Sequence, residues 1–389
     1  MNGLFLFLPT IVIPVLNDTY RVFFLLPLLK SRATFVIDPP LILILTIVVL
    51  SQLNLLLGHL VGIRNEAGFD VQHLVAFNIL TPLAYWISQQ LRLRDFKVFA
   101  WLFALDAVFV VLQSGYGVST FYTSLHNYEV YGTETGLLYF SRPFGLGNNA
   151  SVFSEKLLIF AMILHLLKAR SKFTYPLIVL ALIVLAGILN LGRAALLSIM
   201  IFLVILGVRH AAVNAFRASY LLKLIVVLVV LSVFFTQTND VTSTVIDQFL
   251  RGRQQIELAG REEIWADFMT FIVSNPVMGN ASVKYFTDYY GNVASGHNSF
   301  LMIAATHGLI ITFLYCVLIL ICVNRTNYIY IIPILVFSGA QYSIFWGLSF
   351  SDIVLFYFLR LGNKFRYSRE IVVTVPRFSA TVPGAREKT

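Results

Sequence analysis

Three basic side chains lie at positions where an apolar chain seldom carries charge. Arg193 begins a hydrophobic stretch after a short turn, Arg261 begins an amphipathic stretch, and His297 precedes another hydrophobic stretch. A guanidinium group can hold two phosphate oxygens at once, and an imidazole with an ordinary pKa of about 6.5 suits a general base near neutral pH. These residue types predict chemistry on an anionic, lipid-linked substrate.

Each of these residues also has a structural explanation, which the sequence leaves open. Arg193 could anchor a helix end at a membrane interface, because long basic side chains reach toward water. The unpaired N–H groups at the start of a helix would instead make it part of a phosphate site. Arg261 is followed by two glutamates and could belong to a solvated helix face. His297 could simply lie at the start of a helix, with Asn298 or Ser295 as its cap.

Other polar residues carry weaker signals. The Gly-rich stretch from Arg142 to Asn149 could contribute a third cation and backbone N–H groups, or be a linker rich in turns. Asp106 and His165 fall within apolar stretches, where ionisable groups can form a proton relay. They could equally form a contact between helices, which is the preferred interpretation.

A metal site has little support in the sequence. Glu66 and Asp70 are four residues apart and could form a base or a metal pair, but a solvated loop is the preferred interpretation. The chain contains no His-Glu-x-x-His motif and no two aspartates two residues apart. We therefore expect no metal and no cofactor.

The composition indicates a chain whose solvent is largely lipid. Hydrophobic residues make up 58% of its 389 residues and charged residues only 12%, against about 25% charged in soluble domains. Mean hydropathy is +0.81. A net charge of +9 could suggest nucleic acid, but neither a folded basic face nor an aromatic platform is visible, so we expect no nucleic-acid partner.

Stretches of about 20 apolar residues predict transmembrane helices. The count is 11, or 12 if residues 17–21 divide the first stretch. The predicted spans are residues 4–29, 40–61, 71–91, 97–113, 150–167, 173–189, 194–208, 219–236, 298–322, 328–346 and 348–360.

The distribution of Lys and Arg predicts the orientation. One alternating set of connections, which includes the tail from Arg360, holds 19 of the 28 basic residues. Because cytoplasmic loops carry the excess of Lys and Arg, this set is predicted to be cytoplasmic. Arg193, Arg261 and His297 then all fall on the opposite, outer face.

These features predict an all-α polytopic membrane protein. Its parts are a transmembrane bundle over residues 1–236 with an outer loop at 114–149, a large outer loop at 237–297, further spans over 298–360, and a basic cytoplasmic tail at 361–389. Apolar residues at helical spacing predict an amphipathic helix in the large loop over 264–272, ended by Pro276, and another over 241–250.

The motifs of the second half of the chain resemble the superfamily of O-antigen polymerases (Wzy type) and O-antigen ligases (WaaL type). Nine residues separate His297-Asn298 from Gly308, with Thr312 in register and Ile311 in place of a second glycine. Other matches are an arginine that opens a span, an upstream Arg…Gly…Asn stretch, and an Arg-x-x-x-Trp motif followed by Pro and Gly. The residues that carry them are Arg193, Arg142 to Asn149, Arg261, Trp265, Pro276 and Gly279.

The resemblance implies a multi-pass protein of the bacterial inner membrane whose active site faces the periplasm. Its substrate would be an oligosaccharide on undecaprenyl pyrophosphate, its surroundings the lipid bilayer, and a chain-length regulator a further candidate partner. Arg193 and Arg261 would bind the pyrophosphate, and His297 would act as the general base of an inverting, metal-independent transfer. The resemblance further implies substrate-binding roles, which we assign to Arg142, Asn149, Trp265 and Asn298.

Polymerase activity on repeat units is the preferred reading, and an O-antigen ligase that transfers the glycan to lipid A-core is the alternative. Two readings from other classes also stay open. A proton-coupled transporter would use Asp106 and His165, and a metal-dependent sugar transferase would use Glu66 or Asp70 as its base.

Overall fold

The computed structural model describes residues 35–62, 80–116, 143–146, 150–190, 192–214, 261–289, 292–345, 347–363 and 369–371. These residues are mostly helical, as the sequence predicts. The helices are α2 (Pro39–Val61), α4 (Thr81–Gln90), α5 (Leu93–Tyr116), α7 (Ala150–Ser171), α8 (Leu177–Asn190), α9 (Arg193–Asn214), α12 (Arg261–Ser274), α13 (Ser299–His307), α14 (Leu309–Cys322), α15 (Tyr328–Ala340) and α16 (Phe350–Arg360). The strands are β1 (Phe35–Ile37), β2 (Thr287–Tyr289), β3 (Asn292–Ala294) and β4 (Arg369–Ile371).

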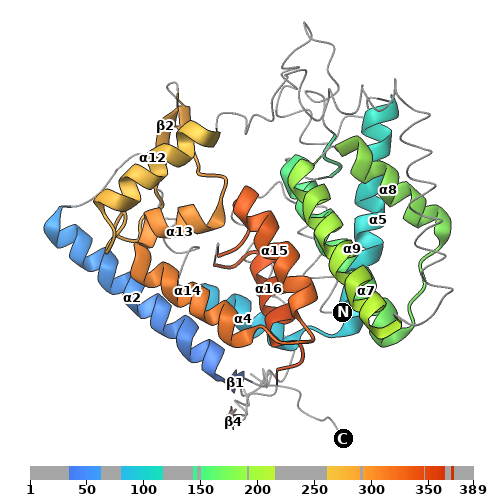
Figure 1. The fold of residues 1–389 in the computed structure, drawn as a ribbon, viewed down its shortest axis with the longest axis horizontal. Coiled ribbons are helices and arrows are strands. Elements are labelled where there is room, and N and C mark those ends of the chain that lie inside the picture. Colours follow the sequence, from blue (N-terminus) through green and yellow to red (C-terminus); the bar gives the residue numbers. More distant parts are fainter. Residues whose placement is uncertain are drawn as a thin grey trace, which may run out of the picture.

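The helices form one bundle, with α5, α7, α8 and α9 on one side and α2, α12, α13 and α14 on the other (Figure 1). Helix α15 packs against α9, and α16 packs against α4. Stacked phenylalanines fill the middle of the bundle. The Phe103 ring lies 5.3 Å from Phe153 and 5.0 Å from Phe160, and Phe99 lies 5.1 Å from Phe350, measured between centroids.

Two short antiparallel strand pairings complete the described structure. Strand β1 pairs with β4, and β2 pairs with β3. The first pairing joins the segment before α2 to the segment after α16. Residues 369–371 of the predicted basic tail therefore pair with residues 35–37.

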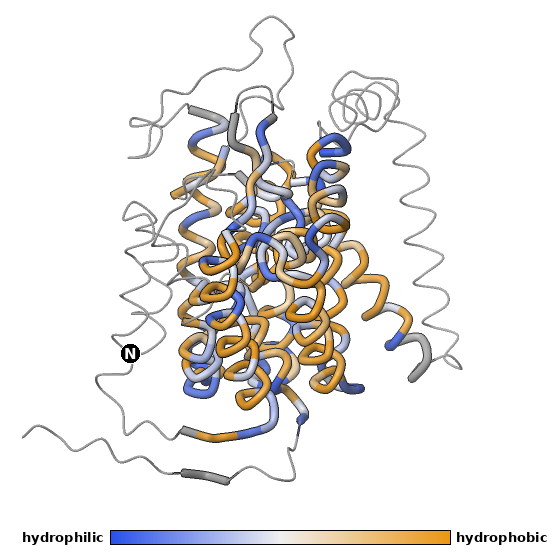
Figure 2. Tube along the Cα trace, turned by 90° about the vertical axis from the view of Figure 1, so that its left-hand side faces the viewer, coloured by the Kyte–Doolittle hydropathy of each residue, from blue (hydrophilic) through white to orange (hydrophobic). Residues whose placement is uncertain are grey.

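Helix α2 is the one described helix that is both long and apolar enough to cross a membrane. Its outer surface is apolar: Val49, Leu56 and Leu60 are at least 57% exposed, whereas Ser51 and Asn54 face inward and are buried. The apolar helices α8, α14 and α15 have 13 or 14 residues each. At about 1.5 Å per residue they are shorter than a hydrocarbon layer of about 30 Å. Hydrophobic residues run along most of each long helix, and hydrophilic residues gather toward the ends (Figure 2).

The predicted span over residues 298–322 is wrong as a single helix. The structure divides it at Gly308 into α13 and α14. Gly308 has φ +81° and ψ 172°, a region that only glycine occupies readily. A Cβ at this position would also overlap the carbonyl oxygen of Val277. Hydropathy alone predicts one continuous helix here, because it averages apolar residues and contains no information on backbone conformation.

The loop after α12 packs into this break and satisfies its backbone groups. The Leu309 amide donates to the Pro276 carbonyl at 2.7 Å, and the Asn280 amide donates to Ala305 at 2.7 Å. The Nδ2 of Asn54 in α2 donates to the Met278 carbonyl at 2.8 Å. Because buried polar groups need partners, these bonds fix the loop, and with it α12, against the helices of the bundle.

Replacing Gly308 with alanine is expected to lower the free energy of unfolding by at least about 1–3 kcal/mol, the cost of a residue held in a disfavoured backbone region. The matched control is Gly207→Ala in α9, where a Cβ would meet nothing within 4 Å. Alanine there is expected to be neutral or to stabilise by up to about 1 kcal/mol. Chemical denaturation of the purified proteins in detergent, followed by circular dichroism, measures both. Equal stability of the two variants would contradict the role of Gly308.

Candidate functional site

Arg261 lies at the first position of α12 and reaches the end of another helix. Its Nη1 donates to the carbonyl oxygen of Ala340, the last residue of α15, at 2.7 Å. The last carbonyls of a helix lack partners within the helix and carry partial negative charge, so a cation is stabilised there. The bond holds the guanidinium, which is half-buried, at the carboxyl end of α15.

Trp265, one turn further along α12, fixes the segment that precedes His297. Its indole Nε1 donates to the Gly296 carbonyl at 2.6 Å. Gly296 packs so tightly that a Cβ would lie 3.1 Å from the Phe268 ring. The predicted amphipathic helix is confirmed, because Ile264, Phe268 and Ile272 are buried along one face of α12. That face packs against α13.

His297 stands at the surface between this segment and α13. Its backbone has φ +43°, a left-handed conformation that is uncommon for a residue with a side chain. The side chain is exposed at the surface. The residue is thus held by its neighbours on both sides, and part of its ring is packed against the protein.

Asn298 caps α13 and ties it to α15. Its Oδ1 accepts hydrogen bonds from the amides of Phe300 and Leu301 at 2.9 and 3.1 Å. Its Nδ2 donates to the Gly339 carbonyl at 2.8 Å, next to the Ala340 carbonyl that Arg261 binds. These bonds hold Asn298 between α13 and α15, directly after His297, and its substrate contact stays a prediction. Trp265 likewise has its indole N–H engaged within the protein.

Lys284 is a further cation of this cluster, and the sequence analysis did not single it out. The side chain is only 7% exposed. Its Nζ lies 4.7 Å from the Phe286 ring centroid and 5.2 Å from that of Tyr342. Aromatic rings attract a desolvated ammonium group through their negative faces. The sequence does not reveal this aromatic environment of Lys284, because Tyr342 belongs to a distant segment.

Burial and the two nearby cations favour the neutral form of His297. Packing around the ring lowers the pKa of His297 below its usual value of 6.5, and the charges of Arg261 and Lys284 lower it further. A positive neighbour makes imidazolium less stable, so the free base predominates at neutral pH. Arg261 and Lys284 are therefore near enough to His297 for their charges to lower its pKa.

Arg193 lies at the same end of the bundle as this cluster. Helices α9 and α15 run antiparallel, since Arg209 near the end of α9 shares a cavity with Thr326 just before α15. The Phe202 and Tyr330 rings face each other with centroids 6.2 Å apart. At about 1.5 Å per residue, the start of α9 and the end of α15 are then at about the same height. Arg193 itself is half-buried.

The turn before Arg193 is held by polar contacts with the predicted Gly-rich stretch. Asn190 Nδ2 donates to the Pro143 carbonyl at 2.8 Å, and the Ser154 hydroxyl donates to Asn190 Oδ1 at 2.6 Å. A Cβ on Gly192 would overlap the Ser154 side chain. The stretch that contains Pro143 therefore lies beside the turn, whereas Arg142 and Asn149 themselves lie outside the described residues.

Four residues of the motif that resembles the polymerase and ligase superfamily meet at the helix break. A Cβ on Gly279 would lie 2.6 Å from the Gly308 amide nitrogen, and the Pro276 carbonyl accepts from the residue after Gly308. The Thr312 hydroxyl donates to the Gly308 carbonyl at 2.8 Å. The spacing of Pro276, Gly279, Gly308 and Thr312 thus corresponds to one packed junction below His297.

The polar residues within apolar stretches contact separate partners. Asp106 forms an ion pair with Lys156 at 3.4 Å and accepts from the Leu146 amide at 2.7 Å. His165 Nδ1 lies 2.9 Å from the Tyr330 hydroxyl. The preferred interpretation, contacts between helices, is confirmed for both. Glu66 and Asp70 lie outside the described residues.

Replacing Lys284 with glutamine is expected to raise the pKa of His297, because one of the charges that lowers it is removed. Diethyl pyrocarbonate modifies only the neutral imidazole, so the pH of half-maximal modification follows this pKa. Mass spectrometry of the peptide that carries His297 measures it. We expect a midpoint below 6.5 in the parent protein and a higher one in Lys284→Gln. Lys97→Gln, at the far end of the bundle, is the control, and an unmoved midpoint in Lys284→Gln would contradict the coupling.

Neither a scan against protein-family models nor a search of curated proteins finds a match for this chain.

Proposed function

We propose that the chain is a glycosyltransferase that polymerises oligosaccharide repeat units carried on undecaprenyl pyrophosphate. The observation that carries this proposal is the cluster at the carboxyl end of α15, where His297 stands beside Arg261 and Lys284 and its pKa is lowered. A neutral imidazole suits proton abstraction from a sugar hydroxyl. Fixed cations beside it suit a leaving group that gains negative charge.

The reaction transfers a glycan from undecaprenyl pyrophosphate to an acceptor hydroxyl. The acceptor hydroxyl gives its proton to His297 and attacks the anomeric carbon of the donor. A new glycosidic C–O bond forms, the bond between that carbon and the pyrophosphate oxygen breaks, and undecaprenyl pyrophosphate leaves with the electron pair. Attack opposite to the leaving group inverts the anomeric centre. His297 then releases its proton to water, so the base is regenerated.

Arginines stabilise the leaving pyrophosphate more than the bound substrate. Charge accumulates on the phosphate oxygens as the bond breaks, and preplaced cations act on that charge without reorganising. We assign this role to Arg261, which the Ala340 carbonyl holds in place, and to Arg193 at the start of α9. Lys284 adds positive charge to the same end of the bundle. Pyrophosphate is already a good leaving group, so we expect the transfer to need no metal.

We further propose that the chain is a multi-pass protein of the bacterial inner membrane with this cluster toward the periplasm. The inward polar and outward apolar faces of α2 suit a lipid surrounding. The opposite end of the bundle carries Arg170, Arg209 and Arg325. An excess of Lys and Arg at one end suits a cytoplasmic face.

The test is extension of a defined undecaprenyl-linked repeat unit by the purified protein. We expect a ladder of longer lipid-linked glycans whose new linkages have the inverted configuration, formed equally well with a chelator present. Lipid A-core added as a second acceptor tests the ligase alternative. A product on lipid A-core without a ladder would replace polymerase by ligase. No glycan transfer to either acceptor would overturn the proposal.

A further inference from the structure

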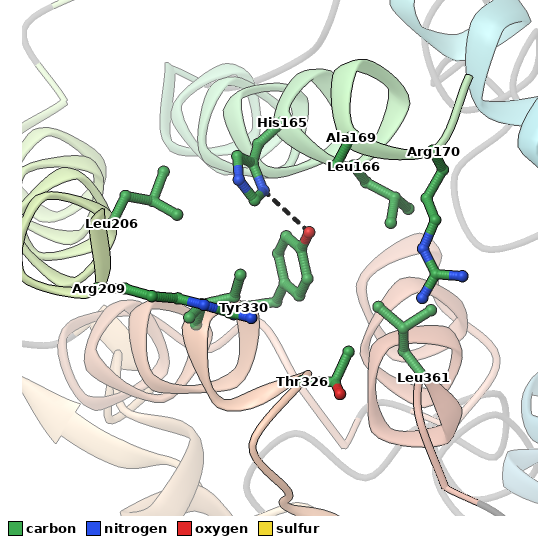
Figure 3. A pocket seen from close by; sticks show the side chains of 10 residues that line it. His165, Leu166, Ala169, Arg170, Leu206, Arg209, Thr326, Tyr330 and Leu361 are labelled. Atoms are coloured by element: carbon green, nitrogen blue, oxygen red, sulfur yellow. Dashed lines mark hydrogen bonds between the residues drawn. The ribbon is translucent and has the colours of Figure 1, made fainter. Parts of the chain in front are cut away.

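A cavity with charged and apolar walls lies at the other end of the bundle from His297. It has a volume of about 420 Å³, within the range of small-molecule sites. Its walls come from the ends of α7 and α9, the start of α15 and the chain just after α16. The residues that line it are His165, Leu166, Ala169, Arg170, Leu206, Arg209, Thr326, Ile329, Tyr330 and Leu361 (Figure 3).

Two arginines from different helices give this cavity its charge. Arg170 extends from α7 and Arg209 from α9, and they enter the cavity from opposite sides (Figure 3). Among the described residues that line the cavity, none is acidic. Within the described part of the chain, neither arginine forms an ion pair with a carboxylate. Two guanidinium groups thus face one space that holds no counter-charge from these residues.

The base of the cavity is built from packed aromatic side chains. Tyr330 bonds His165 through its hydroxyl at 2.9 Å, and its ring stacks on Phe358 with centroids 4.5 Å apart. The Phe202 ring packs beside both His165 and Tyr330. Because these rings are held from several sides, the cavity keeps its shape without a ligand.

The cavity continues into an apolar stripe on the outside of α9. Leu206 and Arg209 line the cavity three residues apart, and Leu203 lies a further three residues back on the same helical face. The Leu203 side chain is 58% exposed, and its neighbour Val204 is 62% exposed. A ligand that fills the cavity with an anionic group would therefore meet an apolar surface directly beside it.

We propose that this cavity binds the phosphate headgroup of an anionic phospholipid, with Arg170 and Arg209 on the phosphate oxygens. The apolar stripe from Leu206 to Leu203 then accommodates the first part of an acyl chain. Arginine suits this role because its planar fork can hold two phosphate oxygens at once. Basic pockets between helices at the cytoplasmic side recognise anionic lipids in the same way. The site is separate from the proposed transfer reaction, since α15 runs between them for about 15 Å from Tyr330 to Ala340.

A free phosphate offers the same anionic chemistry, and the stripe on α9 decides between the two sources. Inorganic phosphate would use the two arginines alone and leave the apolar part of the cavity empty. Leu166, Leu206 and Leu361 make up much of the lining. A lipid is therefore the ligand that would contact both the arginines and the apolar walls. The experiment tests a lipid and inorganic phosphate.

The test is native mass spectrometry of the delipidated full chain titrated with dioleoylphosphatidylglycerol. We expect saturable binding of one lipid, and binding at least about tenfold weaker in the double variant Arg170→Gln/Arg209→Gln, since two charge-assisted phosphate contacts are lost. The double variant Arg170→Lys/Arg209→Lys keeps the charge without the planar fork and is expected to be intermediate. Dioleoylphosphatidylcholine is the neutral-lipid probe, and inorganic phosphate is added as a competitor.

The matched control is Lys168→Gln/Arg325→Gln, which removes the same charge from exposed positions at the same end but outside the cavity. Unchanged phosphatidylglycerol binding in this control, together with loss in Arg170→Gln/Arg209→Gln, supports the site. An equal loss of lipid binding in Arg170→Gln/Arg209→Gln and in this control would mean that only surface charge matters, and would overturn the proposal. Full displacement of lipid by millimolar inorganic phosphate would assign the cavity to a free anion and overturn it as well. Equal binding of phosphatidylcholine would mean that the site does not recognise an anionic headgroup, and would overturn the proposal.

Discussion

Replacing His297 with asparagine lowers the rate of glycan transfer by about 10²–10⁴-fold, the usual contribution of a positioned general base. Asparagine is the informative replacement because it tolerates the left-handed backbone that His297 adopts at φ +43°. Helix α13 keeps its cap through Asn298, so the loss reports chemistry and not folding. Single-turnover transfer from a fluorescent lipid-linked donor measures the rate.

The pH dependence sharpens this prediction. The neutral imidazole is the active form, so the rate falls as pH drops through the pKa of His297, which lies below 6.5. That acidic limb is expected to disappear in His297→Asn. His59→Asn is the matched control, because His59 is an exposed histidine of α2. Retention of the parental rate and acidic limb in His297→Asn would remove the residue from the mechanism.

Replacing Arg261 with glutamine lowers the catalytic rate constant by about 10²–10³-fold, as expected for one donor to a transition-state charge. The KM for the donor rises less, because the interaction strengthens as the pyrophosphate leaves. Arg261→Lys is expected to be intermediate, since lysine keeps the charge but lacks the planar fork. Arg193→Gln is expected to follow the same pattern if both arginines act on the same leaving group.

The control for the arginines is Arg94→Gln, an exposed arginine in the first turn of α5. It removes the same charge and is expected to leave both kinetic constants unchanged. Arg261 also bonds the Ala340 carbonyl, so the thermal stability of each variant is measured beside its rate. A loss of activity that tracks a loss of stability, with rescue at lower temperature, would make Arg261 a structural residue only.

The helices of this chain follow closely from hydropathy. Predicted spans at 40–61, 150–167 and 194–208 correspond to α2, α7 and α9 within a few residues at most ends. A continuous apolar stretch must satisfy its backbone within itself when it meets lipid or a packed core, and a helix does so. The helical spacing of apolar residues also predicts α12, because one face of this helix packs and the other faces solvent.

The candidate site was predictable only in part. Arg261 and His297 stand out because charge is rare in this sequence, and in the structure the charge of Arg261 lowers the pKa of His297. Lys284 was not predictable, because its environment depends on Tyr342, which only the fold places beside it. The break at Gly308 was missed for a related reason. It depends on the contact between the Val277 carbonyl and the glycine backbone, which no hydropathy average contains.

The junction between α12 and the broken span limits how far α12 can move. The Asn280 and Ser282 amides donate to the Ala305 and Thr306 carbonyls at 2.7 and 2.8 Å. The side-chain Nδ2 of Asn54 donates to the Met278 carbonyl. Moving α12 away from the bundle would leave these polar groups without hydrogen-bond partners in apolar surroundings. Each lost partner costs about 1–3 kcal/mol. These bonds fix α12 against the broken span, and we therefore expect α12 to keep its place when the proposed lipid-linked substrate binds.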